Sequence, residues 1–230
     1  MNTLSGKFCP ALSLTTMGHH CISSVLHDLV VTRPELPAGK NGLVCVDATC
    51  GNGHDTCFLV GAMQGAGLAA QGTGGVILAL DVQARAIAST QKALHGRFEH
   101  LPMPVVLLQQ DHAQLAAALE AHAPQQTLAA IIYNLGFLPR SDKKIITRKQ
   151  STLASLEAAA RLLLPGGLIV AHTYGGHPGG SEESAAVNVW FSALPHDLWL
   201  AGKYTLCNKA HNPEILFMAQ KRRHTEQVEQ

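Results

Sequence analysis

The 230-residue chain has few aromatic residues and little charge, and both shortages narrow the kinds of protein it can be. Aromatic residues make up 5% of the sequence and hydrophobic residues 47%, so we expect an aliphatic core that is large enough for a folded protein. The hydrophobic content and the charged content of 14% exclude an intrinsically disordered chain. The formal net charge of +1 produces no strong global field, so a nucleic-acid partner would have to be held by a local basic patch.

Three other signals are missing from the sequence. The six cysteines form no C-x-x-C pair and no regular framework, which favours reduced thiols. No apolar run approaches the ~20 residues that a transmembrane helix needs. The first ten residues lack the charged start and the apolar core of a signal peptide. We therefore expect a cytoplasmic protein without a membrane partner.

Short apolar runs of strand length alternate with segments of helical periodicity along the chain. We predict strands at 43–47, 76–80, 105–108, 128–133, 168–174, 199–207 and 215–220, the last two as an antiparallel pair. This order predicts an α/β fold with a doubly wound, mostly parallel, seven-stranded Rossmann-like sheet and an antiparallel final strand. The length suits a single domain over 1–230, with an N-terminal extension and helix (1–35) and a frayed tail (221–230). We interpret the helix predicted at 18–31 as structural.

The stretch Leu43–Phe58 carries the first functional signal. A short apolar run ends at Asp47, the turn that follows contains Gly51 and Gly53, and an apolar-periodic segment begins at Thr56. The order strand, glycine turn, helix is typical of open α/β sheets that bind nucleotide-like ligands, because glycine permits close approach and a helix N-terminus offers unpaired N–H groups.

Polar residues stand at or just after the ends of five predicted strands, where parallel sheets bind their ligands. A single such residue would most simply form a turn, but a whole row at matching positions indicates a site. Asp81 could accept hydrogen bonds from both ribose hydroxyls of an adenosine group, and Asp47 could face a positive ammonium group. Asp111 could bind the adenine amino group, with His112 beside the ring. The five residues at the strand ends are Asp47, Asp81, Asp111, Asn134 and Tyr174.

Two ligands compete for this arrangement. A dinucleotide fingerprint would have a third glycine where this chain has Thr56 and an acidic residue about 20 residues further on. Asp47 and Asp55 bracket the turn with negative charge, which would repel a pyrophosphate but suits a sulfonium-bearing ligand. S-adenosylmethionine is therefore preferred over NAD. An NAD-dependent oxidoreductase and a non-catalytic cofactor-binding module remain the alternatives from other classes.

Five segments together resemble one known family, the class I methyltransferases labelled "putative rRNA methylase". The segments are D-A-T-C-G-N-G-H-D-T (47–56), D-V-Q-A-x-A-I-x-x-T (81–90), Q-D-H (110–112), Y-N-L-G-F-L-P-x-S-D-K (133–143) and Y-G-G-H-x-G-G-x-E-E (174–183). The resemblance covers about residues 20–220. It implies S-adenosylmethionine-dependent methylation of 5-aminomethyl-2-thiouridine at the tRNA wobble position, with the anticodon region of tRNA as partner, by a homodimer.

The resemblance also implies roles for individual residues. Asn52 and Gly53 approach the methionine part of the cofactor, Asp81 and Gln83 lie at the ribose, and Asp111 and His112 lie at the adenine. Asn134, Leu135 and Gly136 follow the fourth strand, where related enzymes receive the target nitrogen.

Methyl transfer needs mainly the alignment of the acceptor with the methyl carbon. We take Asn134 and Tyr174 as the candidate catalytic residues, Asn134 to orient the amine. A histidine or water would accept the proton, and the sequence leaves both open. Tyr133, Phe137 and Tyr174 could stack on a flipped-out base, although Tyr133 and Phe137 are equally compatible with a core position.

The loop 138–148 is the candidate RNA contact, since four basic residues in it are spaced to meet phosphates. A solvated loop and rRNA or small-molecule substrates are the alternatives. His177 lies in a glycine-rich segment that we expect on the opposite wall of the substrate mouth. His54, His112, His172 and His177 show no spacing typical of metal ligands, so no metal is expected. The four basic residues are Arg140, Lys143, Lys144 and Arg148.

Overall fold

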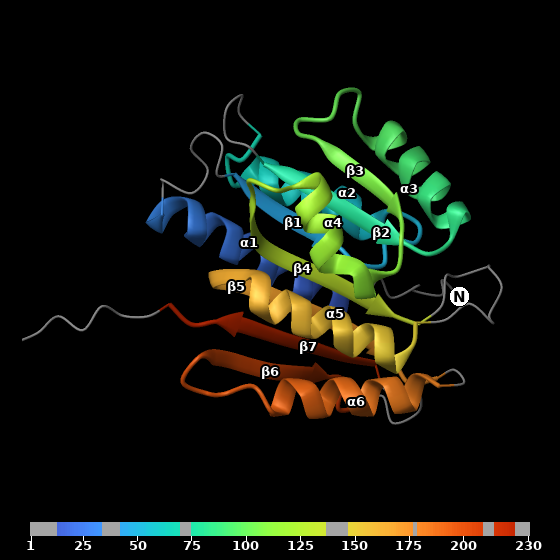
Figure 1. Ribbon diagram of the computed structural model, residues 1–230, viewed down its shortest axis with the longest axis vertical. Coiled ribbons are helices and arrows are strands. Elements are labelled where there is room, and N and C mark those ends of the chain that lie inside the picture. The colour runs from blue at the N-terminus through green and yellow to red at the C-terminus, as the bar shows by residue number, and fades with distance from the viewer. Residues whose placement is uncertain are drawn as a thin grey trace, which may run out of the picture.

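The computed structural model describes residues 13–33, 42–69, 75–136, 147–176, 179–208 and 214–223, and the structural statements concern these ranges. Helices and strands alternate along the chain (Figure 1). The strands are β1 (Leu43–Asp47), β2 (Val76–Asp81), β3 (Val105–Gln109), β4 (Thr127–Leu135), β5 (Leu163–Tyr174), β6 (Trp199–Thr205) and β7 (Glu214–Lys221). The helices are α1 (Leu14–Thr32), α2 (His54–Gly65), α3 (Ala84–Arg97), the 3-10 turn η2 (His112–Gln114), α4 (Leu115–His122), α5 (Lys149–Leu162) and α6 (Gly180–Ser192).

The described strands form one sheet in the order β3-β2-β1-β4-β5-β7-β6. Strands β1 to β5 pair in parallel, and β7 lies antiparallel between β5 and β6. This arrangement confirms the predicted α/β sheet of seven strands with an antiparallel final strand. Its chain order reverses direction between β1 and β4, which is the switch point at which open α/β sheets bind ligands.

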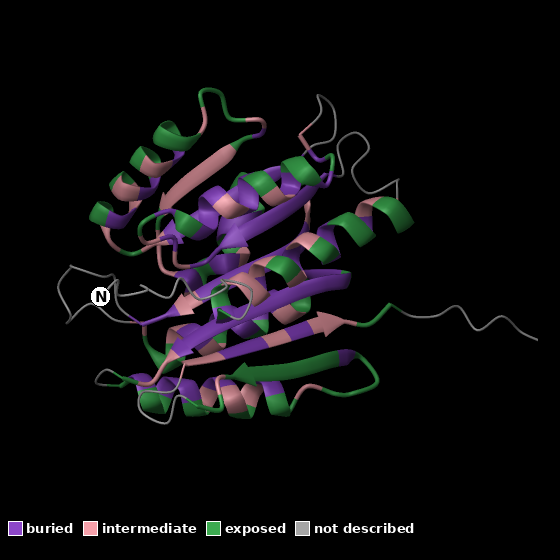
Figure 2. Cartoon of the chain, turned by 180° about the vertical axis from the view of Figure 1, so that it is seen from behind, coloured by how far each residue is buried: buried purple, intermediate pink, exposed green. Residues whose placement is uncertain are grey.

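Helices cover both faces of the sheet, and each face has its own aliphatic core. On one face α1, α2 and α3 pack on the sheet, as Figure 2 shows from behind. On the other face α4, α5 and α6 do so. All five residues of β1 are buried, as expected of a strand that is covered on both sides. Each fully buried aliphatic side chain contributes roughly 1.5–3 kcal/mol, so the strands whose ends carry the site are firmly held.

Strand β5 begins earlier than the sequence indicates. The predicted strand starts at residue 168, but the run Pro165-Gly166-Gly167 already lies inside β5. A Cβ on Gly167 would stand 2.7 Å from the Ala129 carbonyl oxygen, so the glycine permits close approach to β4 rather than a turn. Gly166 has a φ of 92°, a backbone conformation that favours glycine.

The predicted frayed tail begins at residue 221, but Lys221 and Arg223 are held by contacts with the rest of the protein. Lys221 Nζ donates to the carbonyl oxygens of Ala160 and Leu163, at 3.0 and 2.9 Å. Arg223 pairs with Asp28 of α1 at 2.5 Å. The rest of the predicted frayed tail lies outside the described residues, as do the extension through residue 12 and most of the loop between α2 and β2. The division of the chain into a single domain stays a prediction. No helix within the described ranges has the length and apolarity to cross a membrane.

Candidate functional site

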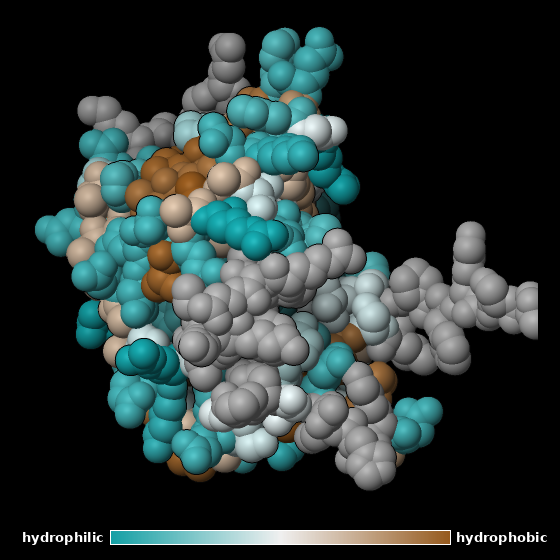
Figure 3. Space-filling view, turned by 90° about the vertical axis from the view of Figure 1, so that its right-hand side faces the viewer, coloured by the Kyte–Doolittle hydropathy of each residue, from teal (hydrophilic) through white to brown (hydrophobic). Residues whose placement is uncertain are grey.

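The carboxyl ends of β1, β2, β3 and β4 meet at one end of the molecule, on the right in Figure 1. Figure 3 looks onto this end, where hydrophilic side chains surround a few hydrophobic patches. The structure therefore brings together the polar residues that the sequence places at successive strand ends.

The glycine turn between β1 and α2 is packed tightly against α3. Gly53 has a φ of 80°, and a Cβ there would stand 2.8 Å from the Cα of Thr90. The Thr90 hydroxyl donates to the carbonyl oxygens of Cys50 and Gly51, both at 3.3 Å. Asn52, at the tip, is exposed. The turn therefore presents backbone groups in a fixed shape that only glycine permits at position 53.

Asp81 ties the end of β2 to this turn. Its Oδ2 accepts the backbone N–H of Gly51 at 3.1 Å, and its Oδ1 accepts that of Gln83 at 2.9 Å. Burial raises the pKa of Asp81. Each carboxylate oxygen keeps a further lone pair, so Asp81 can accept hydroxyl groups beside the turn. Gln83, the other residue predicted at the ribose, stands at the N-cap of α3.

Asp47 is fully buried behind the turn. It accepts the Thr56 hydroxyl at 2.6 Å and the Thr49 N–H at 3.3 Å. Burial raises its pKa to about 8, and the negative charges of Asp55 and Asp81 add to the shift. Asp47 thus holds the turn through its hydrogen bonds to Thr49 and Thr56. Since it is buried, it would act on a cationic ligand by electrostatic attraction and not by direct contact.

Asp111 and His112 stand where β3 leads into η2. The Asp111 carboxylate caps η2 by accepting the Ala113 N–H at 2.8 Å. His112 is 6% exposed, and burial lowers its pKa. Its Nε2 is buried without a hydrogen-bond partner among the described residues. An unsatisfied buried nitrogen is costly, so His112 is suited to a ligand that supplies a partner.

Asn134 is fixed at the end of β4 by both its backbone and its side chain. Its backbone N–H donates to Thr49 Oγ1 at 2.7 Å, and its Nδ2 donates to Asp55 Oδ2. Leu135 is 1% exposed and packs in the core. The carbonyl oxygen of Gly136 accepts the Thr147 N–H at 2.9 Å and so closes the base of the following loop. Of the three residues predicted to meet the acceptor, Asn134 has a polar side chain at the site.

The sequence did not indicate that α1 contributes to this site. His19 of α1 pairs through Nε2 with Asp55 Oδ1 at 2.6 Å, and its ring stacks on Phe58 at 3.7 Å between centroids. Asp55 therefore joins His19 to Asn134 through its two oxygens. The interpretation of the leading helix as purely structural was incomplete. The sequence shows only that His19 lies in a helical segment. It does not indicate that the partner of His19 is Asp55, 36 residues further on.

Tyr174 belongs to a second polar chain at the end of β5. Its hydroxyl lies 2.9 Å from His172 Nδ1, and His172 Nε2 lies 3.7 Å from a Glu214 carboxylate oxygen. Burial and the charges of Glu214 and Asp55 raise the pKa of Tyr174. The phenol is therefore protonated at neutral pH, and it is suited to donating or accepting a hydrogen bond rather than to acting as a phenolate.

Tyr133, for which base stacking was one alternative, is a core residue. Its side chain has no exposed surface, and its hydroxyl lies 2.8 Å from Ser155 Oγ. Its ring meets His112 edge-on at 6.0 Å between centroids. Tyr133 supports the adenine side of the predicted site from behind.

The predicted RNA-binding loop is described only at its two ends. Arg148 is exposed at the N-cap of α5. Just before it, the Thr147 hydroxyl donates to Glu183 at 2.5 Å, and Thr152 donates to the same carboxylate at 2.6 Å. Glu183 is 3% exposed, so a buried carboxylate of α6 anchors the returning end of the loop. The remaining predicted contacts, together with Phe137, lie outside the described residues: Arg140, Lys143, Lys144 and His177.

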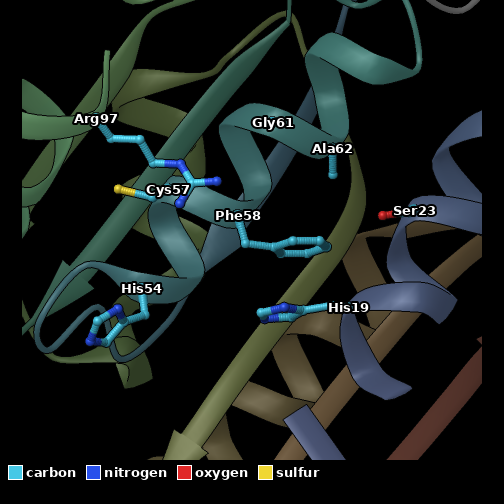
Figure 4. A pocket seen from close by; sticks show the side chains of 8 residues that line it. All are labelled: His19, Ser23, His54, Cys57, Phe58, Gly61, Ala62 and Arg97. Carbon is cyan, nitrogen blue, oxygen red and sulfur yellow. The ribbon is translucent and has the colours of Figure 1, made fainter. Parts of the chain in front are cut away.

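A groove of about 450 Å³ lies beside His19, between α1, α2 and the end of α3 (Figure 4). It combines an aromatic wall, Phe58, with the basic side chains of His54 and Arg97. Among the described residues, no group of three histidine, cysteine, aspartate or glutamate side chains is placed to hold a metal ion.

The residues present fit the expected cofactor on three counts. The Gly53 backbone leaves a cradle that a Cβ would fill. The negative charges of Asp55 and Asp81 raise the pKa of Asp47, and a positively charged ligand would favour its ionised form. The unpartnered Nε2 of His112 lies on the side predicted for the adenine.

Residues 77–220, more than half of the chain, match the family described as "Putative rRNA methylase". A curated relative from Arabidopsis thaliana, "tRNA (mnm(5)s(2)U34)-methyltransferase, chloroplastic", is 36% identical over 180 residues. The match covers 78% of this chain and 64% of that relative, so the chain spans less than two thirds of the relative's length.

Solved structures show the same fold. A crystal structure from Clostridium thermocellum described as "putative rRNA-methylase" is 31% identical, with a TM-score of 0.67 over 85% of this chain and 94% of that one. A Streptococcus mutans protein described as "a putative methyltransferase" and solved with SAH is 23% identical, with a TM-score of 0.68 over 91% and 98% of the two chains.

Proposed function

The chain belongs to the family described as "Putative rRNA methylase", and from this premise we propose that it is an S-adenosylmethionine-dependent methyltransferase that acts on RNA. The proposed reaction is N-methylation of the 5-aminomethyl group of 5-aminomethyl-2-thiouridine at the tRNA wobble position. The name of the 36% identical Arabidopsis relative, a tRNA (mnm(5)s(2)U34)-methyltransferase, supports this substrate.

One observation carries the cofactor assignment: Asp81 accepts one backbone N–H on each oxygen, one of them from Gly51 of the glycine turn, and each oxygen has a second lone pair for a ligand. In the proposed complex Asp81 and Gln83 bind the ribose, and Asp111 and His112 bind the adenine. The backbone of the turn from Gly51 to Gly53 meets the methionine part. When bound, S-adenosylmethionine supplies a methyl group on a positively charged sulfur. The buried carboxylates of the chain favour that charge, since they have no cationic side chain of lysine or arginine beside them among the described contacts.

The acceptor amine is aligned by the end of β4. Asn134 is held rigidly by Thr49 and Asp55, so its side-chain oxygen is available as an acceptor for an amine N–H. Tyr174 stands at the end of the neighbouring strand and provides a hydroxyl and a ring face. Holding the amine in line with the methyl carbon is the main contribution that such a site makes to the rate.

Calorimetry of S-adenosylmethionine binding tests the cofactor assignment through Asp81. Asp81→Ala removes the acceptor of the ribose hydroxyls and of the Gly51 N–H, so we expect binding to fall below detection while the protein stays folded. Asp197→Ala, at an exposed aspartate outside the site, is the matched control and should bind as the wild type does. Wild-type affinity in Asp81→Ala would overturn the assignment.

The proposed RNA contact is the basic loop that follows Gly136, with Arg140, Lys143, Lys144 and Arg148 at the phosphates of the anticodon region. Counterion release makes such binding weaken as salt increases. His177 forms part of the opposite wall in this proposal. We further propose a homodimer, as the resemblance implies. The cytoplasmic location stays a prediction, since the chloroplast is part of the name of the relative alone.

A further inference from the structure

His19 of α1 is held in one orientation beside the acceptor position. Its Nε2 lies 2.6 Å from Asp55 Oδ1, and its ring lies flat on Phe58 with an angle of 2° between the planes (Figure 4). A hydrogen bond and a stacked ring together restrain both side-chain torsions. The family match begins at residue 77, so it assigns nothing to this helix.

Asp55 holds the side chains of His19 and Asn134 close to each other. The two oxygens of this carboxylate accept from His19 and from Asn134 respectively. Because both groups bind the same carboxylate, His19 Nε2 and the side-chain nitrogen of Asn134 lie within about 7 Å of each other. Asn134 is the residue proposed to orient the acceptor amine, and Asp55 is the one residue that lies between it and the imidazole.

The pairing also fixes which nitrogen of His19 is basic. An ionised Asp55 accepts hydrogen bonds only, so the neutral ring carries its proton on Nε2 and presents a lone pair at Nδ1. In the described part of the chain Nδ1 makes no hydrogen bond, and the side chain is 23% exposed beside the groove of α1 and α2. Charged and titratable groups come from every element around this region: Asp47 of β1, His54, Asp55 and Cys57 of α2, Arg97 of α3 and Tyr174 of β5.

The proposed substrate requires such a group. An aminomethyl nitrogen is protonated near neutral pH, as a lysine side chain is, and an ammonium has no lone pair with which to attack. Resting on the proposed function, we propose that Nδ1 of His19 accepts the proton of the substrate ammonium and that Asp55 stabilises the resulting imidazolium.

The step balances without another reactant. The ammonium loses one proton to His19 and becomes a neutral amine. The amine nitrogen then forms a bond to the methyl carbon while the carbon–sulfur bond breaks and its electron pair stays on sulfur. The product is a secondary ammonium that keeps its own two protons, and His19 returns its proton to water.

A competing account is that His19 only fastens α1 to α2. His19→Gln separates the two accounts, because glutamine keeps an N–H donor for Asp55 but has no nitrogen that binds a proton. We expect the turnover number for hypomodified tRNA at pH 7 to fall by about 100-fold or more, with unchanged S-adenosylmethionine affinity by calorimetry. Raising the pH to about 9 should narrow the gap, since a larger share of the amine is then unprotonated. His20→Gln, at the exposed neighbour on the same helix, should behave as the wild type.

Two further measurements keep the test decisive. Added imidazole should restore part of the activity of His19→Ala, where truncation leaves space beneath Phe58. Nitrogen-15 NMR of the free protein, at a pH where the imidazole is neutral, should show the ring proton of His19 on Nε2. Wild-type turnover in His19→Gln at pH 7, a loss equal at every pH, or an Nδ1–H tautomer would each overturn the role of His19. A wild-type protein that transfers no methyl group to tRNA would refute the proposed function itself, and the role of His19 with it.

Discussion

At the scale of single residues, the site is defined by a group of carboxylates close to one another, for which no lysine or arginine partner is found among the described contacts. Asp55 lies close enough to Asp47 for its charge to raise the pKa of Asp47, and Asp47 has no solvent contact. A sulfonium ligand would relieve this repulsion, whereas a pyrophosphate would increase it. The electrostatics of the turn therefore support the preference for S-adenosylmethionine over a dinucleotide.

The raised pKa of Asp47 makes stability depend on pH. An unfolded aspartate titrates near pH 4, while burial raises the pKa of folded Asp47 to about 8. Between these values the folded state binds more protons than the unfolded state, so the free energy of unfolding falls as pH rises from about 4 to about 8. In Asp47→Asn that contribution is absent, and urea unfolding at pH 5, 6.5 and 8 should show a shallower decline.

Asp81, whose pKa is also raised, leaves a residual slope of the same sign in the variant. Asp197→Asn serves as the control, since that side chain is exposed, and it should follow the wild-type decline. Parallel curves for the wild type and Asp47→Asn would show that Asp47 is ionised in the folded protein.

Residues at strand ends could be predicted from the sequence because each follows directly from a local pattern. Asp81 ends an apolar run, so its position at the carboxyl end of β2, next to the turn that contains Gly51, could be predicted. The pairing of His19 with Asp55 could not be predicted, since it depends on how α1 packs across the sheet. The core position of Tyr133 likewise depends on Ser155 of α5.

At the scale of elements, α6 anchors the segment by which the chain enters α5, next to the loop that is proposed to contact RNA. Glu183 is buried and accepts two threonine hydroxyls from the segment that enters α5. The hydrogen bond from Thr147 to Gly136 closes the same loop at its base. The two hydrogen bonds of Glu183 therefore connect α6 to the start of α5.

Removing this anchor should affect stability and RNA binding together. Glu183→Ala leaves two hydroxyls without their acceptor, so we expect the free energy of unfolding to drop by about 2–3 kcal/mol. RNA affinity, measured by fluorescence anisotropy, should fall while S-adenosylmethionine affinity is kept. Glu182→Ala removes the exposed neighbour on the same helix and should change neither quantity appreciably. Equal behaviour of the two variants would exclude Glu183 as an anchor.

Element boundaries show where local patterns mislead. Pro165-Gly166-Gly167 has the composition of a turn, yet it lies within β5, where Gly167 permits contact with Ala129 of β4. The helix α2 begins at His54, two residues before the predicted start, because Gly53 adopts the left-handed conformation that a helix entry of this shape needs. Both differences arise from contacts between neighbouring segments.

At the scale of the whole molecule, the sheet gathers the cofactor side and the acceptor side at one end. The order β3-β2-β1-β4-β5 puts Asp81 and Asp111 on one flank of the glycine turn and Asn134 and Tyr174 on the other. This arrangement was predictable because buried parallel strands read as apolar runs and their connections are right-handed. The contribution of α1 became visible only in the assembled fold.

Nucleoside mass spectrometry of tRNA tests the central proposal most directly. Transfer RNA that carries unmethylated 5-aminomethyl-2-thiouridine is incubated with the protein and S-adenosylmethionine, digested and compared with mature tRNA treated in the same way. We predict that this nucleoside is converted to its N-methyl derivative at the wobble position and that mature tRNA gains no methyl group. Unchanged 5-aminomethyl-2-thiouridine in tRNA, with a methyl group on ribosomal RNA or on a small molecule instead, would contradict the account.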